Sequence, residues 1–135
     1  MSVKQLSVFA ENKNGSLYEI TEILSKNGID IRAFSIADTQ SYGILRLIVS
    51  DPRAAAFALS QEGKIVNVTD VVGAQIPDRK GGLSELLGVI TKANIAVEYL
   101  YAFTTTETGK AFVVFRVEDN ESVEKLLSEN GINVL

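Results

Sequence analysis

The sequence predicts an α+β protein built from two copies of one module, each with the element order strand, helix, strand, strand, helix, strand. Two observations carry this prediction. A glycine-containing corner between a strand and a helix occurs at residues 12–17 and again at residues 78–83. The chain also matches itself at a constant offset of 66 positions, which places Gly15 on Gly81. An offset that holds over many residues is the signature of a duplicated module.

The first half of the chain contains signals for one complete module. Ser16 and Glu19 match a capping box, in which the serine hydroxyl accepts a hydrogen bond from the Glu19 amide. Asp51 before Pro52 predicts the cap and the first residue of a second helix. We expect strands over residues 3–10, 29–38, 44–49 and 65–72, and helices over residues 16–27 and 51–63. This order is the split βαβ pattern of the ferredoxin-like fold, an antiparallel sheet with helices on one face.

The second half repeats this order, so we predict one module over residues 1–70 and another over residues 71–135. The expected elements are strands over residues 71–76, 95–104, 111–117 and 132–135, a helix over residues 82–93 and a last helix capped by Asn120. The inward faces expected from helical spacing are Leu17, Ile20, Ile23 and Leu24 in the first module and Leu83, Leu86, Leu87 and Ile90 in the second. Beyond the hairpin the offset becomes 68, so the second hairpin is two residues longer. Turns accept such insertions, whereas strands do not.

The strands over residues 29–38 and 44–49 are apolar on both faces. Phe34 and Ile36 alternate with small residues, and Ile48 shares a face with Arg46. A sheet with one solvent-facing side is normally polar on that side. We therefore expect a second sheet or a partner chain to cover it, and we predict a homodimer. Scattered apolar surface residues are the alternative explanation.

Composition excludes several classes of function. The chain has 13 basic and 17 acidic residues, which leaves no basic footprint for nucleic acid or an anionic membrane. It has no cysteine and no histidine, so thiolate chemistry, disulfides and the commonest metal ligand are absent. No carboxylate cluster recurs at metal-ligand spacing. We expect no catalytic residues, no metal and no cofactor.

The N-terminal residues lack the apolar core of a secretory signal, and no apolar run approaches the roughly 20 residues that span a bilayer. We therefore expect a cytoplasmic protein. An RNA-binding domain is a structural alternative, because it shares this topology and residues 109–115 partly match its RNP1 pattern. Thr108 and Lys110 stand where that pattern requires a basic and an aromatic residue, so the match is incomplete.

Four stretches together resemble the ACT domain family. They are Gln5–Phe9 leading into Glu11–Leu17, Ser35–Thr39 with Tyr42–Val49, Val72–Leu83, and Glu98–Phe103. The resemblance covers the whole chain, which looks like two ACT modules in tandem. It implies a βαββαβ module that binds an amino acid or a similar small metabolite at an interface between modules and regulates another protein. The alternative hypothesis is that the protein is a regulatory or interaction subunit, which binds a metabolic enzyme without a ligand of its own.

The resemblance also implies which residues hold the ligand, namely the loop before the first helix and the start of the second strand of each module. Carried onto this sequence, the first set is Asn12, Asn14, Gly15, Ser16 and Leu17 with Asp30 and Ile31, and the second is Asp78, Arg79, Gly81, Gly82 and Leu83 with Ala96 and Val97. Many ACT loops have proline before the glycine, where this chain has Asn14 and Lys80. Asp30 and Ala96 replace the asparagine that often begins the second strand, so the second site lacks a polar side chain there.

The chemistry of these positions suits an amino acid. Loop amides at a helix N-terminus attract the α-carboxylate, and a carboxylate such as Asp30 or Asp38 attracts the ammonium group. Asp38 has an alternative role, which is to start the hairpin turn through a bond to the backbone. Arg79 either pairs with a ligand carboxylate or is simply solvated.

Overall fold

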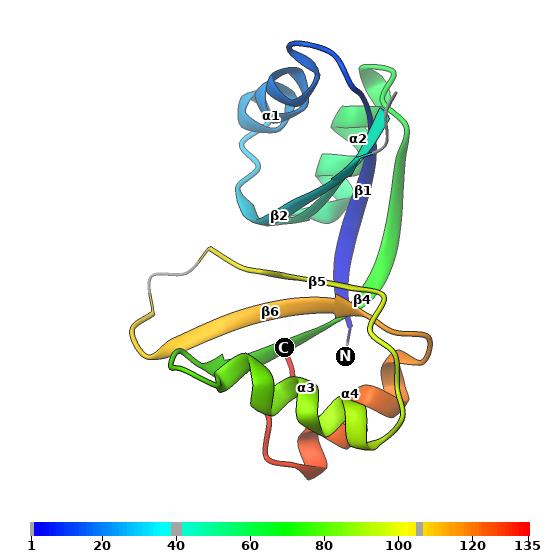
Figure 1. Cartoon of the computed structure of the whole chain (residues 1–135). Helices are drawn as coiled ribbons and strands as arrows, with labels where there is room; N and C mark the ends of the chain where they lie inside the picture. The colour runs from blue at the N-terminus through cyan, green and yellow to red at the C-terminus, as the bar shows by residue number, and fades with distance from the viewer. Residues whose placement is uncertain (1, 39–41, 105–106) are drawn as a thin grey trace. The chain divides into compact units, whose positions relative to one another are not determined.

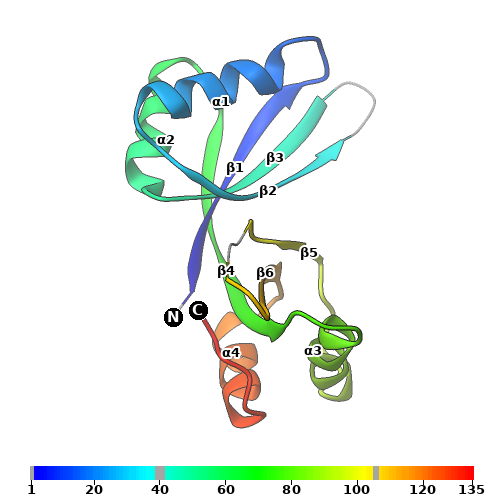
Figure 2. The ribbon, with the colours of Figure 1, turned by 90° about the vertical axis from the view of Figure 1, so that its left-hand side faces the viewer.

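The protein is described from a computed structural model over residues 2–38, 42–104 and 107–135, without the side chain of Asp38. The chain divides into an N-terminal unit, Lys4–Thr69, and a C-terminal unit, Asp70–Leu135 with the residues up to Val3. In each unit two helices cover one face of an antiparallel sheet, as Figures 1 and 2 show. This arrangement confirms the predicted α+β class with two ferredoxin-like modules.

The N-terminal unit has the strand order β2-β3-β1-β4. Its elements are β1 (Val3–Glu11), α1 (Ser16–Lys26), β2 (Ile31–Asp38), β3 (Tyr42–Val49), α2 (Pro52–Gln61) and the first residues of β4 (Val66–Pro77). Antiparallel pairing places Val8 opposite Leu45 and Leu45 opposite Ile36. Directly opposed residues point to the same face of a sheet, so these three side chains share the helix-covered face. Because β2 stands at the end of the strand order, it is an edge strand of the sheet.

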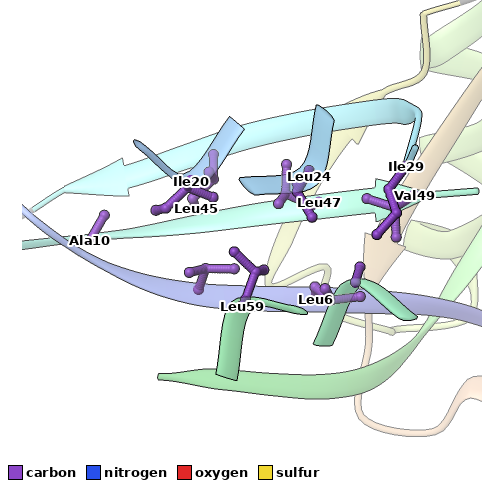
Figure 3. Close-up of a cluster of buried hydrophobic side chains, with 11 residues drawn as sticks. Leu6, Ala10, Ile20, Leu24, Ile29, Leu45, Leu47, Val49 and Leu59 are labelled. Atoms are coloured by element: carbon purple, nitrogen blue, oxygen red, sulfur yellow. The ribbon is translucent and has the colours of Figure 1, made fainter. Parts of the chain in front are cut away.

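The core of this unit lies between α1, α2 and the sheet. Figure 3 shows Ile20 and Leu24 of α1 pointing toward Leu45 and Leu47 of β3. Leu59 of α2 belongs to the same buried cluster. These helix residues recur every three or four positions, which is the spacing that puts them on one face. Their burial fixes how α1 is rotated against the sheet.

The C-terminal unit has the strand order β4-β6-β5. Its further elements are α3 (Gly82–Lys92), β5 (Tyr99–Ala102), β6 (Lys110–Arg116) and α4 (Asn120–Glu129). The C-terminal residues add a short bridge, in which the Leu135 amide donates to the Gly73 carbonyl oxygen. No helix in the described parts of the chain has the length and apolar character to cross a membrane.

Strand predictions were wrong at three places, one of which is the end of the chain, where the strand expected over residues 132–135 is only an isolated bridge between Ala74 and Val134. The strands expected over residues 65–72 and 71–76 are one continuous strand, β4, because the backbone stays extended from Val66 to Pro77. The strand expected over residues 95–104 shrinks to Tyr99–Ala102. Its partner β6 ends at Arg116, which lies opposite Tyr99, so the preceding residues have no strand to pair with.

Two cap predictions were also wrong. Ser16 is the first helical residue of α1, and the cap is Gly15, so no capping box forms with Glu19. The left-handed backbone conformation of Gly15 starts the helix one residue earlier than a Ser16 cap would. Asp119 caps α4 through a bond from the Ser122 amide, while the Asn120 side chain donates to the Asp70 carbonyl oxygen. The predicted Asp51 cap of α2 is confirmed by the bond from the Ala54 amide.

The inward faces of α1 and α3 each leave out one predicted residue. Leu17 and Leu83 are exposed, whereas Ile20 and Leu86 are buried. The buried residue of the first turn is the preceding one, Ser16 in α1 and Gly82 in α3. The exposure of both leucines places two apolar side chains beside the repeated corners.

Replacing Gly88 by alanine should raise the free energy of unfolding by about 0.5–1 kcal/mol. Gly88 lies inside α3, and an added Cβ would meet open space. The matched change Gly82→Ala should lower stability, since its Cβ would overlap the Pro77 carbonyl oxygen. Urea unfolding of both variants measures these changes in the free energy of unfolding. A Gly82→Ala variant as stable as the wild type would contradict the close packing of that corner.

Candidate functional site

The repeated corner has the same geometry in both units. Gly15 and Gly81 are the caps of α1 and α3, with left-handed φ angles of 90° and 84°. Neither helix has a side-chain hydrogen bond at its cap. The first bonds to the caps come from the amides of Glu19 and Glu85, each at 2.9 Å. Before them, the Ser16 and Gly82 amides already donate to the Lys13 and Arg79 carbonyl oxygens, at 3.3 and 3.0 Å. The next two amides of each helix are left to other acceptors, and they lie at the positive end of the helix dipole.

The structure brings most predicted loop residues to the surface of these corners. In the N-terminal unit Asn12, Asn14, Gly15 and Leu17 are exposed, and only Ser16 is buried. The C-terminal corner exposes Asp78, Arg79, Gly81 and Leu83 and buries Gly82. The corners are thus open to a small ligand.

The structure does not bring the second-strand residues to the same place. Asp30 and Ile31 follow α1, whose 11 residues span about 16 Å from the corner. Figure 1 shows the β1–α1 loop and the α1–β2 connection at opposite ends of the helix. Ala96 and Val97 follow α3 in the same way. Within one unit, the two predicted halves of a site therefore cannot touch one ligand.

Ala96 instead lines a surface hollow of about 670 Å³ in the C-terminal unit, together with Glu98, Glu118 and Asp119. Two of these carboxylates already have partners. Asp119 caps α4, and Glu98 lies 3.4 Å from the Arg116 guanidinium. Within residues 2–38, 42–104 and 107–135, no three acidic side chains gather in a way that could hold a metal ion. The Asp38 prediction concerns a side chain outside the described part.

The N-terminal corner has two neighbours that sequence reasoning missed, Lys64 and the side chain of Glu19. The Lys64 Nζ donates to the Glu19 Oε1 at 2.8 Å. Hydrogen bonding and attraction by Lys64 lower the pKa of Glu19 from its ordinary 4.5. These residues and Ser16 border a hollow of about 190 Å³, here named the α1 hollow. No sequence signal joins Lys64 to Glu19, because they are 45 positions apart.

The C-terminal corner pairs its charges differently. The Arg79 Nη2 contacts both carboxylate oxygens of Glu85, at 2.8 and 3.0 Å. Arg79 comes from the loop itself, whereas Lys64 comes from the turn after α2. Arg79 is therefore ion-paired rather than only solvated. Both copies of the module keep the glutamate of this ion pair, but its basic partner is a lysine in the N-terminal unit and an arginine in the C-terminal unit.

A family model for the ACT domain pair matches residues 1–135. The chain belongs to this family. The predicted resemblance is thereby confirmed. A protein of known structure from Bacteroides thetaiotaomicron is 41% identical, with a TM-score of 0.93 over 100% of this chain and 92% of the other.

Two more distant structures share the fold of this ACT domain pair. The ligand-free regulatory subunit of aspartate kinase from Thermus thermophilus is 13% identical, with a TM-score of 0.69 over 95% of this chain and 91% of the other. The regulatory subunit of aspartate kinase from Thermus flavus is 12% identical, with a TM-score of 0.64 over 96% of this chain and 92% of the other. A comparison with curated protein sequences found no match.

Lys64→Met should raise the pKa of Glu19, which NMR titration of its carboxyl carbon will measure. A carboxyl group whose folded-state pKa is lowered stabilises the fold above its unfolded pKa, and this contribution is lost as pH falls through the folded value. The stability lost in Lys64→Met should therefore shrink as pH drops below 4.5. Lys110→Met, which breaks a pair with Glu107, is the control and should leave the Glu19 titration unchanged. An unchanged pKa in Lys64→Met would contradict the ion pair.

Proposed function

We propose that this ACT domain pair is a non-catalytic regulatory protein that binds an amino acid at the corners before α1 and α3. The observation that carries the proposal is the left-handed glycine at both corners, Gly15 and Gly81, which leaves first-turn amides without a cap. Such amides at a helix N-terminus bind carboxylates. Both corners are exposed, so a ligand can reach them.

We place the ligand at an interface between modules. The corner of one module and the second-strand start of another would each supply part of the site, because the two lie at opposite ends of a single unit. Asp30 would attract the ammonium group, and Ile31 would contact the side chain. Ala96 offers no such charge, so we propose that sites using it bind more weakly.

The regulated target in this proposal is an enzyme of amino-acid metabolism. Support comes from the shared fold of the aspartate kinase regulatory subunit from Thermus thermophilus, which has nearly the same extent as this chain. The alternative is a subunit that binds such an enzyme without a ligand of its own. Exposed apolar residues favour protein contact in either case.

We also propose that the protein is a homodimer formed along β2. This strand ends the order of its sheet, and its outer edge can pair with another strand. Phe34 and Ile36 lie on β2 and are exposed, Phe34 by 62%. Covering such side chains is the usual reason for chains to associate.

One or a few of the twenty amino acids should raise the midpoint of thermal unfolding, because a ligand that binds only the native state stabilises it. Gly15→Val should abolish that shift, since a β-branched residue resists a φ of 90°. Gly131→Val imposes similar strain at a φ of 74° in the other unit and should retain the shift. No shift with any amino acid would favour the subunit without a ligand.

Phe34→Glu should convert the dimer to a monomer in sedimentation equilibrium, because it places a charge in the proposed contact. Phe57→Glu is the matched control, since Phe57 is 67% exposed on α2 and away from the β2 edge. This control should remain dimeric. Dissociation by both variants, or by neither, would argue against the β2 edge.

A further inference from the structure

The chain contains the dipeptide Asn-Gly three times, each time at one end of a helix. The copies are Asn14-Gly15, Asn27-Gly28 and Asn130-Gly131. In this dipeptide the asparagine side chain can react with the backbone amide that follows it, because glycine has no Cβ to obstruct the approach. The structure decides which of the three copies is free to react.

Two of the copies end α1 and α4, and hydrogen bonds hold both of their reacting groups. The Asn27 Nδ2 donates to the Ile23 carbonyl oxygen at 2.8 Å. The Gly28 amide donates to the Ser25 carbonyl oxygen at 3.0 Å. The pair that begins with Asn130 repeats this geometry at the end of α4, at 2.8 and 3.1 Å. These bonds satisfy the last carbonyl oxygens of each helix, and both must break before the side chain can meet the amide.

Asn14 and Gly15 lie instead in the exposed loop between β1 and α1. The bond from the Ser16 amide to the Lys13 carbonyl oxygen closes a turn that has these two residues at its centre. The φ and ψ angles of Gly15, 90° and −10°, are those of the second central residue of a type II turn. Within the described residues, neither the Asn14 side chain nor the Gly15 amide makes a hydrogen bond. Both reacting groups are therefore free.

The reaction needs only these two groups and water. The Gly15 amide nitrogen bonds to the Cγ of Asn14, the Cγ–Nδ2 bond breaks, and the amide proton leaves with Nδ2 as ammonia. The product is a cyclic succinimide. Water then adds to one carbonyl carbon of this ring and opens it, which gives aspartate or, through the other carbonyl carbon, isoaspartate. The net change replaces a neutral amide by a carboxylate, and nothing is oxidised or reduced.

The corner before α3 cannot undergo this change. The offset of 66 positions places Lys80 at the position of Asn14, directly before Gly81. A lysine side chain has no amide carbon that the backbone nitrogen could attack. Deamidation at the corners is therefore confined to the N-terminal unit, and it would make the two corners differ in charge.

We propose that Asn14 is a site of spontaneous deamidation, which gives the corner before α1 a neutral and an anionic form. The effect on binding rests on the function proposed above, in which the amides of the first turn hold a ligand carboxylate. A carboxylate at residue 14 lies beside that position. It repels the ligand and competes for the same positive end of the helix. Deamidation therefore weakens binding at this corner and not at the corner before α3.

Tryptic peptide mapping of the full chain, kept folded in mildly alkaline buffer, tests the modification. Trypsin separates the three copies into residues 14–26, 27–32 and 126–135, and fragment masses locate the change within each peptide. Asn14 should gain the mass of an amide-to-acid exchange roughly tenfold or more faster than Asn27 and Asn130, because their hydrogen bonds must break first. In guanidinium chloride, which removes the fold, the three rates should become similar.

Two results would overturn the modification. One is equal rates at the three copies in the folded protein, and the other is a faster change at Asn27 or Asn130. Asn14→Gln is the control for the assignment, since the longer side chain would have to close a larger and slower-forming ring. This variant should show no comparable mass gain in residues 14–26.

Asn14→Asp reproduces one product and tests the effect on binding. Calorimetric titration with an amino acid that stabilises the wild type should give a Kd roughly two to five times higher, as expected for repulsion between exposed charges. Asn130→Asp adds the same charge at the end of α4 and should bind like the wild type. Unchanged binding by Asn14→Asp would overturn the effect on the ligand. Failure of all twenty amino acids to stabilise the wild type would overturn the sensing function and this effect, while peptide mapping decides the deamidation separately.

Discussion

The left-handed corner before each first helix is the constraint on which the rest of this structure depends. Gly15 and Gly81 adopt φ angles that residues with a side chain rarely accept, and this lets a strand turn directly into a helix. The same geometry leaves each helix without a side-chain cap. Unsatisfied amides at the positive end of a helix then persist at two exposed places, and any anion-binding function of this ACT domain pair starts from them.

Duplication preserved the corner but not its surroundings. Both copies keep a glutamate one turn into the helix, yet its base is Lys64 in one unit and Arg79 in the other. The residue after the corner glycine is serine in the first copy and glycine in the second, where the Pro77 carbonyl oxygen occupies the space. Equivalent folds therefore present different chemistry, and the two corners need not bind the same molecule.

The predictions that failed did so for physical reasons. Helical periodicity shows which residues share a face of a helix but not which of them the sheet covers. It therefore predicted Leu17 and Leu83 to be inward, although the buried residue of each first turn is Ser16 or Gly82. Capping rules recognised Ser16 as a cap because they consider side chains, whereas the backbone of the preceding glycine decided the turn. The strand expected from residue 95 failed because its length depends on β6, a partner elsewhere in the chain.

The sequence by itself determined the family, the two modules, the corners and the order of elements, because each of these is written in local patterns that recur at a fixed offset. Only the tertiary structure decided which charges meet. Lys64 reaches Glu19 across 45 positions, and Asp30 is held a helix length away from Gly15. Such distances follow from how α1 and α2 pack on the sheet, and packing depends on the whole core rather than on any stretch of residues.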